Sequence, residues 1–367
     1  MKILETGVKK VRNVGGFVIG REALLELKNL LEFRRSFGSG DVVYFIDMFF
    51  AGSETLISSM HARKKDLIIF VDTTEEPTTD MVDQFVTQIK SFFSSEPSAI
   101  VGIGGGSTMD VAKAAANLLT NGGLAEQYQG WDLLEHPAIY KIAVPTLSGT
   151  GAEATRTCVM TNKCSGLKLG MNSDFTVFDQ VIMDPELTRT VPRNQYFYSG
   201  MDAYLHCMEA LAGSYRNPVG DALSREAINL CKIVFLSSDM MSEENREILM
   251  VASYLGGCAI ATTYVGLVHP LSAGLSVVLG LHHCVANCVV MRAMREFYPT
   301  QYELFWSMAE AQNIDIPEGL ASNLSESQYD QLYESSIIHS KPLTNALGKD
   351  YKSILTKKTV TSLFRQM

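Results

Sequence analysis

The first half of this chain alternates between short apolar runs of strand length and longer segments with helical spacing. Strands that alternate with helices are typical of βαβ units, in which helices cover a mostly parallel sheet. The expected strands are 17–20, 42–47, 66–73, 141–146 and the stretch 98–107, which ends in a glycine turn. The expected helices are 21–37, 54–64, 78–93 and 108–119. The sequence therefore predicts an α/β fold for this half.

The pattern changes after about Pro185. Downstream of it, strand signals are absent, and long segments such as 194–213 carry apolar residues at helical spacing. A chain of 367 residues is also long for one domain. We therefore expect two domains, an α/β domain at 1–186 and an all-helical domain at 187–367.

Composition excludes some classes of function. The formal net charge is −9, which argues against nucleic acid or an anionic membrane as a partner. The seven cysteines are irregularly spaced, form no C-x-x-C pair and follow a start too polar for a secretory signal. We therefore expect reduced thiols in a cytoplasmic protein, rather than a disulfide framework or a structural zinc ribbon.

One long stretch, 248–291, contains no Asp, Glu, Lys or Arg. Its first part is long enough to span a bilayer. However, it contains Gly, Ser, Thr and Tyr, follows several glutamates and lacks a basic flank. We expect a buried core helix here rather than a membrane span.

Four polar residues of the helical half have the side chains of a metal site. Asp202 and His206 are four apart in a segment expected to be helical, so both side chains lie on one face. His269 and His283 are fourteen apart. On one unbroken helix they would be about 21 Å apart, so the chain must turn back between them if both bind one ion. One carboxylate and three imidazoles suit Fe²⁺, Zn²⁺, Co²⁺ or Mn²⁺. The alternative is four unrelated polar residues.

The turn 102–107 follows an expected strand and opens an expected helix. Its three consecutive glycines let the backbone approach a ligand closely, and the N–H groups at a helix N-terminus bind phosphate. It is neither the G-x-G-x-x-G fingerprint, because its sixth residue is Ser107, nor a Walker A loop. The loop 145–151 also follows a strand, and two such loops can line one cofactor crevice. The alternative for the glycine turn is an ordinary tight turn.

Asp47 ends the expected strand 42–47. An acidic residue at this position accepts hydrogen bonds from an adenine ribose and repels a 2′-phosphate, which favours NAD over NADP. The alternative is a polar residue that simply ends the strand.

Together these motifs resemble the iron-containing (group III) alcohol dehydrogenase family over nearly the whole chain. The matching segments are GGGSTMDVAK (104–113), PTLSGTGAEAT (145–155), DPELTRTVP (184–192), GMDAYLHCMEA (200–210) and the stretch from His269 to Asn287. The resemblance implies the dehydroquinate synthase-like fold, in which an α/β dinucleotide-binding domain precedes an all-helical domain for metal and substrate. It also implies a metal-dependent alcohol oxidoreductase that uses NAD, and a homodimer is expected for such enzymes.

The resemblance also assigns the site residues. It places the metal ligands at Asp202, His206, His269 and His283. It places cofactor contacts at Gly104, Gly105, Gly106, Ser107, Asp110, Thr146, Ser148, Thr150 and Lys168. A metal held by this set would lower the pKa of a substrate hydroxyl, and a nicotinamide ring would accept the hydride.

Two positions depart from the family pattern. Many members have a histidine four residues after the third ligand, where this chain has Ala273, and a small residue leaves room for a bulky substrate. Many have Pro-His-Gly at the fourth ligand, where this chain has His282, His283 and Cys284. His282 is therefore a candidate catalytic residue for proton relay, or else only a neighbour of the ligand.

Within the family, MDAYLHCMEA and HPLSAGLSVVLGLHHCVANC are most similar to the 3-deoxy-D-manno-octulosonate (Kdo) 8-oxidases of lipopolysaccharide biosynthesis. That likeness implies oxidation of the C8 hydroxyl to an aldehyde, which a partner aminotransferase converts to 8-amino-Kdo. The electron acceptor, NAD or oxygen, stays open. So do three other functions: an NAD-dependent dehydrogenase of a small primary alcohol or diol, a relative of dehydroquinate synthase or glycerol dehydrogenase, and a non-catalytic nucleotide- or metal-binding protein.

Overall fold

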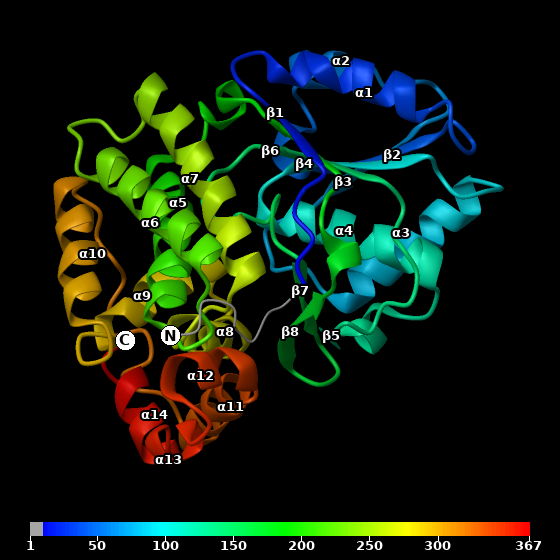
Figure 1. Ribbon diagram of the computed structural model, residues 1–367. Helices are drawn as coiled ribbons and strands as arrows, with labels where there is room; N and C mark the ends of the chain where they lie inside the picture. The colour runs from blue at the N-terminus through cyan, green and yellow to red at the C-terminus, as the bar shows by residue number, and fades with distance from the viewer. Residues whose placement is uncertain (1–9) are drawn as a thin grey trace.

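The computed structural model describes residues 10–367 and has an α/β half followed by a helical half (Figure 1). This architecture confirms the expected fold class. The boundary at residue 186 stays a prediction; the last strand is β9 (Gln180–Met183) and the first long helix is α5 (Arg193–Ala212). The polar start of the chain, which argues against a secretory signal, lies partly outside the described residues.

Six parallel strands form the main sheet, in the order β1-β9-β6-β4-β2-β3. The five strands expected from the sequence are β1 (Gly16–Ile19), β2 (Val42–Asp47), β3 (Leu67–Val71), β4 (Ala99–Gly104) and β6 (Lys141–Pro145). The strands β2, β4 and β6 consist almost wholly of buried residues. Continuous apolar runs are expected of parallel strands that are covered on both faces.

Helices cover both faces of this sheet (Figure 1). The helices α1 (Glu26–Arg34) and α2 (Glu54–Ser59) pack on one face, and α3 (Thr79–Phe92) and α4 (Gly106–Asn121) pack on the other. The helix α2 is shorter than the expected 54–64, because His61 adopts a left-handed φ of 52° that ends it.

The structure also contains a second, smaller sheet that the sequence did not predict. It joins β5 (Gly130–Trp131), β8 (Leu167–Asn172) and β7 (Thr157–Asn162), of which β7 and β8 form an antiparallel pair. Alternate residues of β7 are buried and half-buried, as in a sheet with one covered face. This sheet brings Trp131 and Lys168 to the side of the cavity described below.

The helical half packs around α5, which is buried along nearly its whole length. Its neighbours include α6 (Pro218–Phe235), α7 (Glu243–Thr262), α8 (Val268–Leu279) and α9 (His283–Val290). The remaining helices are α10 (Pro299–Ala311), α11 (Glu326–Ile337), α12 (Ser340–Leu347), α13 (Tyr351–Ile354) and α14 (Lys357–Phe364).

The uncharged stretch 248–291 forms most of α7 and all of α8 and α9, and most of its residues are buried, as expected. Within residues 10–367, the length and apolar character that a membrane span requires are not combined in any helix.

The loop after β6 connects the two halves at close range. Gly149 has a φ of +140°, and a Cβ there would lie 1.6 Å from the carbonyl oxygen of Ser199 on α5. Gly151 has a φ of +62°, and a Cβ there would lie 2.6 Å from the Cα of Gly257 on α7. Only glycine permits both the dihedrals and the contact. The loop 145–151 is therefore fixed directly against the helical half.

Candidate metal centre and cofactor cleft

The structure brings Asp202, His206, His269 and His283 together at one place between three helices. Asp202 and His206 lie on α5, His269 near the start of α8, and His283 at the first residue of α9. The chain turns back between the last two at Gly280, which ends α8 with a left-handed φ of 68°. One ligand-type atom from each of the four lies within 4.8 Å of the others. The expected convergence is present, and the role of these residues as ligands stays a prediction.

The distances suit a single small cation. Asp202 Oδ1 lies 3.5 Å from His206 Nε2 and 3.3 Å from His269 Nε2, and Asp202 Oδ2 lies 3.7 Å from His283 Nε2. Ligand atoms held about 2.1 Å from one ion at tetrahedral angles are about 3.4 Å apart. The donor set and its spacing therefore fit a divalent transition metal such as Fe²⁺ or Zn²⁺.

Burial and neighbouring charges set the protonation states of three of these groups. Burial by itself raises the pKa of Asp202, but His206, His283 and His269 outweigh burial and bring that pKa well below its usual range. Burial lowers the pKa of His206 to about 4 and that of His283 to about 3, despite the nearby carboxylate. At neutral pH the carboxylate is ionised and these two imidazoles are neutral, which are the protonation states that metal ligands need.

Glu209 orients the remaining histidine. Glu209 Oε2 lies 2.5 Å from His269 Nδ1, and Glu209 Oε1 accepts a hydrogen bond from Val268 N at 2.5 Å. Burial lowers the pKa of His269, but Glu209 and Asp202 outweigh burial and raise it to about 9. A carboxylate bound to Nδ1 fixes the tautomer that leaves Nε2 for the metal and strengthens it as a ligand. The sequence analysis missed Glu209, although it follows Asp202 by seven residues, two turns along the same helix face.

Two further polar residues surround the cluster. Asn287 Nδ2 donates a hydrogen bond to Asp202 Oδ1 at 2.7 Å. From the α/β half, Glu76 Oε1 accepts a hydrogen bond from His283 N at 2.6 Å, and Glu76 Oε2 lies 3.2 Å from Lys168 Nζ. Glu76 therefore ties the start of α9 to the second sheet, across the junction between the two halves.

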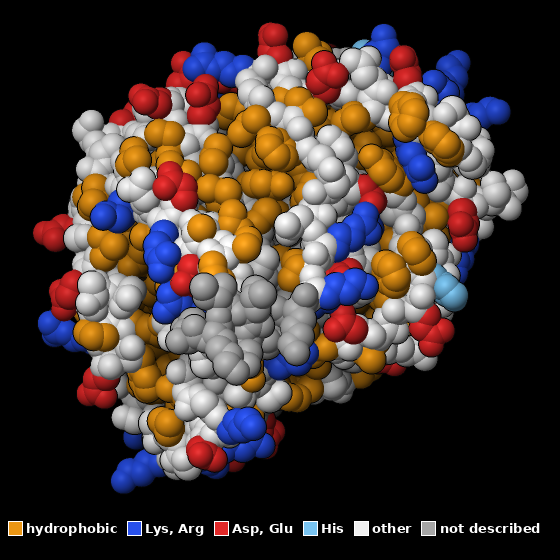
Figure 2. Space-filling model, in the orientation of Figure 1, with side chains coloured by type: hydrophobic (Ala, Val, Ile, Leu, Met, Phe, Trp, Pro, Cys, Tyr) orange, Lys and Arg blue, Asp and Glu red, His pale blue; other side chains and the backbone are white. Residues whose placement is uncertain are grey.

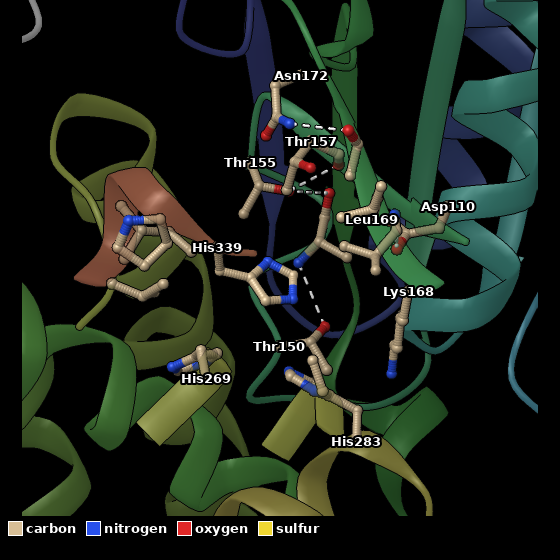
Figure 3. Close-up of a pocket in the computed structure, with 18 of the residues that line it drawn as sticks. Asp110, Thr150, Thr155, Thr157, Lys168, Leu169, Asn172, His269, His283 and His339 are labelled. Carbon is tan, nitrogen blue, oxygen red and sulfur yellow. Dashed lines mark hydrogen bonds between the residues drawn. The ribbon is translucent and has the colours of Figure 1, made fainter. Parts of the chain in front are cut away.

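The four candidate ligands line a cavity of about 380 Å³, and Figure 3 shows two of them, His269 and His283, in its wall. Other parts of its wall come from the glycine turn, the second sheet and the segment that joins α11 to α12. A cavity of this size, with a few polar groups among apolar ones, is typical of small-molecule sites.

The expected cofactor contacts divide into two groups. Those that line the cavity are Gly106, Ser107, Asp110, Thr150 and Lys168. Those that lie beside it without lining it are Gly104, Gly105, Thr146 and Ser148. The first N–H groups of α4 have no side-chain cap, so they are available to a phosphate. Asp110 Oδ2 accepts a hydrogen bond from Val159 N at 2.9 Å, which joins α4 to β7.

Asp47 lies beside the glycine turn but does not line the cavity. The strands β2 and β4 are neighbours, and their pairing ends at Ile46 and Ile103, so Asp47 follows at the same edge of the sheet as Gly104. The Asp47 carboxylate accepts hydrogen bonds from Phe49 N at 3.0 Å and from Thr73 Oγ1 at 3.2 Å.

Two histidines besides the candidate ligands line the cavity. His282 is exposed and precedes the first residue of α9, without a side-chain hydrogen bond to the helix start. His339, just before α12, points into the cavity above His269 and His283 in the view of Figure 3. His339 Nε2 is shielded from solvent and has no hydrogen-bond partner within residues 10–367. Burial and then the charge of Lys168 lower the pKa of His339 to about 4. No sequence motif marks His339, so the sequence analysis missed it.

Family models and curated relatives match this chain. The model described as iron-containing alcohol dehydrogenase matches residues 16–185, and the model for the C-terminal part of the iron-containing alcohol dehydrogenase family matches residues 196–327. A sulfoacetaldehyde reductase of Bilophila wadsworthia is 33% identical over 59% of this chain and 56% of its own length. An NAD-dependent methanol dehydrogenase of Bacillus methanolicus is 31% identical over 75% of this chain and 72% of its own length.

Solved structures share the fold. A 1,3-propanediol oxidoreductase superposes with a TM-score of 0.83 at 21% identity, over 97% of this chain and 99% of its own. A sulfoacetaldehyde reductase from Bifidobacterium kashiwanohense, solved in complex with NAD⁺, superposes with a TM-score of 0.77 at 24% identity, over 97% of each chain. These similarities extend over both halves of the molecule and therefore show that the whole architecture is shared.

Proposed function

Since this chain belongs to the iron-containing alcohol dehydrogenase family, we propose that it oxidises a primary alcohol to an aldehyde, with a divalent metal and NAD as cofactors. The observation that carries the proposal is one carboxylate and three imidazoles clustered in the wall of a cavity that the glycine turn also lines. A metal site and a phosphate-binding turn on one cavity are the two parts that hydride transfer from an alcohol to a nicotinamide needs.

Asp202, His206, His269 and His283 would hold the metal. When bound, a divalent ion of this kind acts as a Lewis acid and lowers the pKa of a substrate hydroxyl. Asp202 contributes the one negative charge among the four, and Glu209 fixes the direction of the His269 ring. Iron is the metal in the family name, and zinc, cobalt and manganese accept the same donor set.

The dinucleotide would bind along the glycine turn. The uncapped N–H groups at the start of α4 suit its phosphates. Thr150 and Lys168 face the same cavity and would contact the cofactor there. Asp47 would accept hydrogen bonds from the adenine ribose and repel a 2′-phosphate, which selects NAD over NADP.

His282 would relay the proton that leaves the substrate hydroxyl. Its side chain is suited to this role because it lines the cavity and is also exposed to solvent. An imidazole is the usual proton carrier in enzymes near neutral pH.

The substrate proposed for this site is Kdo, oxidised at its C8 hydroxyl. The support is the similarity of 201–210 and 269–288 to the Kdo 8-oxidases, together with the small Ala273 in the cavity wall. The aldehyde product would be consumed by a pathway aminotransferase that makes 8-amino-Kdo for lipopolysaccharide.

A second candidate is NAD-dependent oxidation of a small primary alcohol or diol, which the methanol and 1,3-propanediol enzymes among the similar proteins favour. The test is to assay metal-loaded protein with Kdo, methanol and 1,3-propanediol, with NAD⁺ and separately with oxygen. We expect NADH formation to be fastest with Kdo. Turnover of only the small alcohols supports the second candidate, and oxygen consumption without NADH identifies oxygen as the acceptor. NAD binding without metal-dependent turnover supports a non-catalytic relative.

We also propose a homodimer. Within residues 10–367, the edge strand β1 pairs only with β9, and its Phe17 and Ile19 side chains are 54% and 46% exposed. Figure 2 shows hydrophobic side chains gathered where β1 approaches α7, and there Phe17 packs on Tyr254. An apolar edge strand of this kind is suited to burial against a second copy, and light scattering after size exclusion measures the mass.

A cytoplasmic location remains part of the proposal. All seven cysteines are unpaired, which supports a reducing compartment.

A further inference from the structure

One basic side chain of the cavity wall has no carboxylate partner. The cavity is lined by three basic residues, Arg156, Lys168 and Lys341. Arg156 pairs with Asp132 at 2.5 Å, and Lys168 pairs with Glu76 at 3.2 Å. Lys341 makes no ion pair and no side-chain hydrogen bond within residues 10–367. The Asp132 carboxylate acts on the Lys341 charge only from a distance, because it pairs with Arg156, so no carboxylate contacts the ammonium directly.

Aromatic rings fix the position of the Lys341 ammonium. Lys341 Nζ lies 3.6 Å from the centroid of the Trp131 ring and 5.8 Å from that of Tyr264. The Trp131 and Tyr264 rings pack edge to face with centroids 5.3 Å apart, and Tyr215 packs on Tyr264 in the same way. A cation over an aromatic face is held in place while it keeps its charge and its N–H donors. Lys341 thus offers a positioned ammonium to a ligand in the cavity.

We propose that Lys341 contacts an anionic group of the substrate, so that the site selects an alcohol that also carries a carboxylate over a neutral alcohol. The inference rests on the proposed function, because it names the substrate class of the same site. The net charge of the chain is −9, so its overall field repels anions. A local cation in the cavity wall would offset this repulsion for an acidic substrate.

The position of Lys341 favours the substrate over the cofactor phosphates. Lys341 belongs to α12 and Tyr264 lies between α7 and α8, so both come from the helical half, whereas Trp131, the ring nearest to the ammonium, comes from β5 of the second sheet. The N–H groups suited to phosphate belong to α4 of the α/β half. The cavity-lining segment 338–342 also lies beyond residue 327, where the family match ends. This part of the wall is therefore a place where the chain can be specific for its own substrate.

The test compares Kdo with its methyl ester, which has the same hydroxyls but no carboxylate charge. Calorimetry measures the Kd of each for metal-loaded wild type, Lys341→Met, Lys341→Arg and the control Lys349→Met, which removes an exposed lysine outside the cavity. We expect wild type to bind the acid about tenfold more tightly than the ester, in line with a charge-assisted hydrogen bond. Lys341→Met is expected to lose this preference, Lys341→Arg to keep most of it, and Lys349→Met to leave it unchanged.

Three results would overturn the proposal. The first is equal affinity of the wild type for the acid and the ester. The second is a Lys341→Met protein that unfolds at the wild-type temperature and still prefers the acid to the same extent. The third is a weaker Kd for NAD⁺ in Lys341→Met with an unchanged acid preference, which would assign the ammonium to the cofactor phosphates. NADH formation from the ester, measured in the same samples, tests the proposed function separately. Absence of both NADH formation and oxygen consumption refutes oxidation of this alcohol, while the binding comparison still decides the role of Lys341.

Discussion

Glu209 Oε2 lies 2.5 Å from His269 Nδ1, although the two residues are 60 positions apart in the chain. A buried carboxylate on α5 therefore decides which nitrogen of a ring on α8 faces the candidate metal position. The same helix provides Asp202 and His206. The centre thus depends on α5 for two of its proposed ligands and for the orientation of a third.

The first prediction concerns this carboxylate. Glu209→Gln is expected to weaken metal binding about ten- to a hundredfold. The amide has a single acceptor oxygen, so it cannot replace both the contact to His269 Nδ1 and the hydrogen bond from Val268 N. Competition with a chelator of known affinity measures the change, and Glu303→Gln, at an exposed position on α10, is the control. Unchanged metal affinity in Glu209→Gln would contradict the orienting role.

The second prediction concerns pH. The pKa of His269 is raised to about 9, whereas those of His206 and His283 are lowered to about 4 and 3. At pH 7 only His269 of the three is in the doubly protonated imidazolium form, and the proton on its Nε2 must leave before a metal binds. Metal affinity is therefore expected to rise about tenfold per pH unit from pH 6 to about pH 9 and then to level off. Chelator competition at stepped pH measures this, and a flat profile in that window would show that His269 is already neutral.

The third prediction concerns His282. If it relays the substrate proton, His282→Ala lowers kcat about a hundredfold or more, while metal content and the KM for NAD⁺ stay unchanged. Steady-state kinetics and metal analysis on one preparation check this. An unaltered kcat would leave His282 as a neighbour of the centre. His339→Ala is then the variant expected to show the loss, because His339 Nε2 lies unpaired in the same cavity.

The fourth prediction concerns the choice of dinucleotide. Asp47→Asn keeps an acceptor for the N–H of Phe49 but removes the charge that would repel a 2′-phosphate. We expect the ratio of kcat/KM for NAD⁺ to kcat/KM for NADP⁺ to fall about tenfold or more, mainly through improved use of NADP⁺. An unchanged thermal unfolding temperature serves as the control that the hydrogen bond from Phe49 N is retained. A ratio that does not change would place Asp47 away from the ribose.

The spacing of apolar residues along the chain was sufficient to predict much of the fold. The strands β2 and β4 are continuous apolar runs, and the helix expected at 194–213 differs by one residue at each end from α5. The hairpin of β7 and β8 was not predicted, because its strands, although as long as β2 and β4, mix polar residues with apolar ones and form no continuous apolar run. The helix expected at 54–64 is shortened by a backbone conformation at His61 that spacing alone does not reveal.

Ligand chemistry was sufficient to select four residues that the fold brings together. Their surroundings depend on contacts between distant parts of the chain. Glu76 accepts a hydrogen bond from the N–H of His283, 207 residues away, and His339 reaches the cavity only through the packing of α11 and α12. Of Glu76, His339 and Glu209, only Glu209 could have been found from helical spacing, because it lies two turns beyond Asp202 on the same helix.

The metal-to-protein ratio of purified wild type and Asp202→Ala tests most directly whether the four residues hold one ion on which turnover depends. About one ion per chain is expected in the wild type. In Asp202→Ala almost no bound metal is expected, with turnover nearly abolished and the far-ultraviolet circular dichroism of a folded protein. An Asp202→Ala protein that stays active without metal, or that binds as much metal as the wild type, would contradict this role of the four residues.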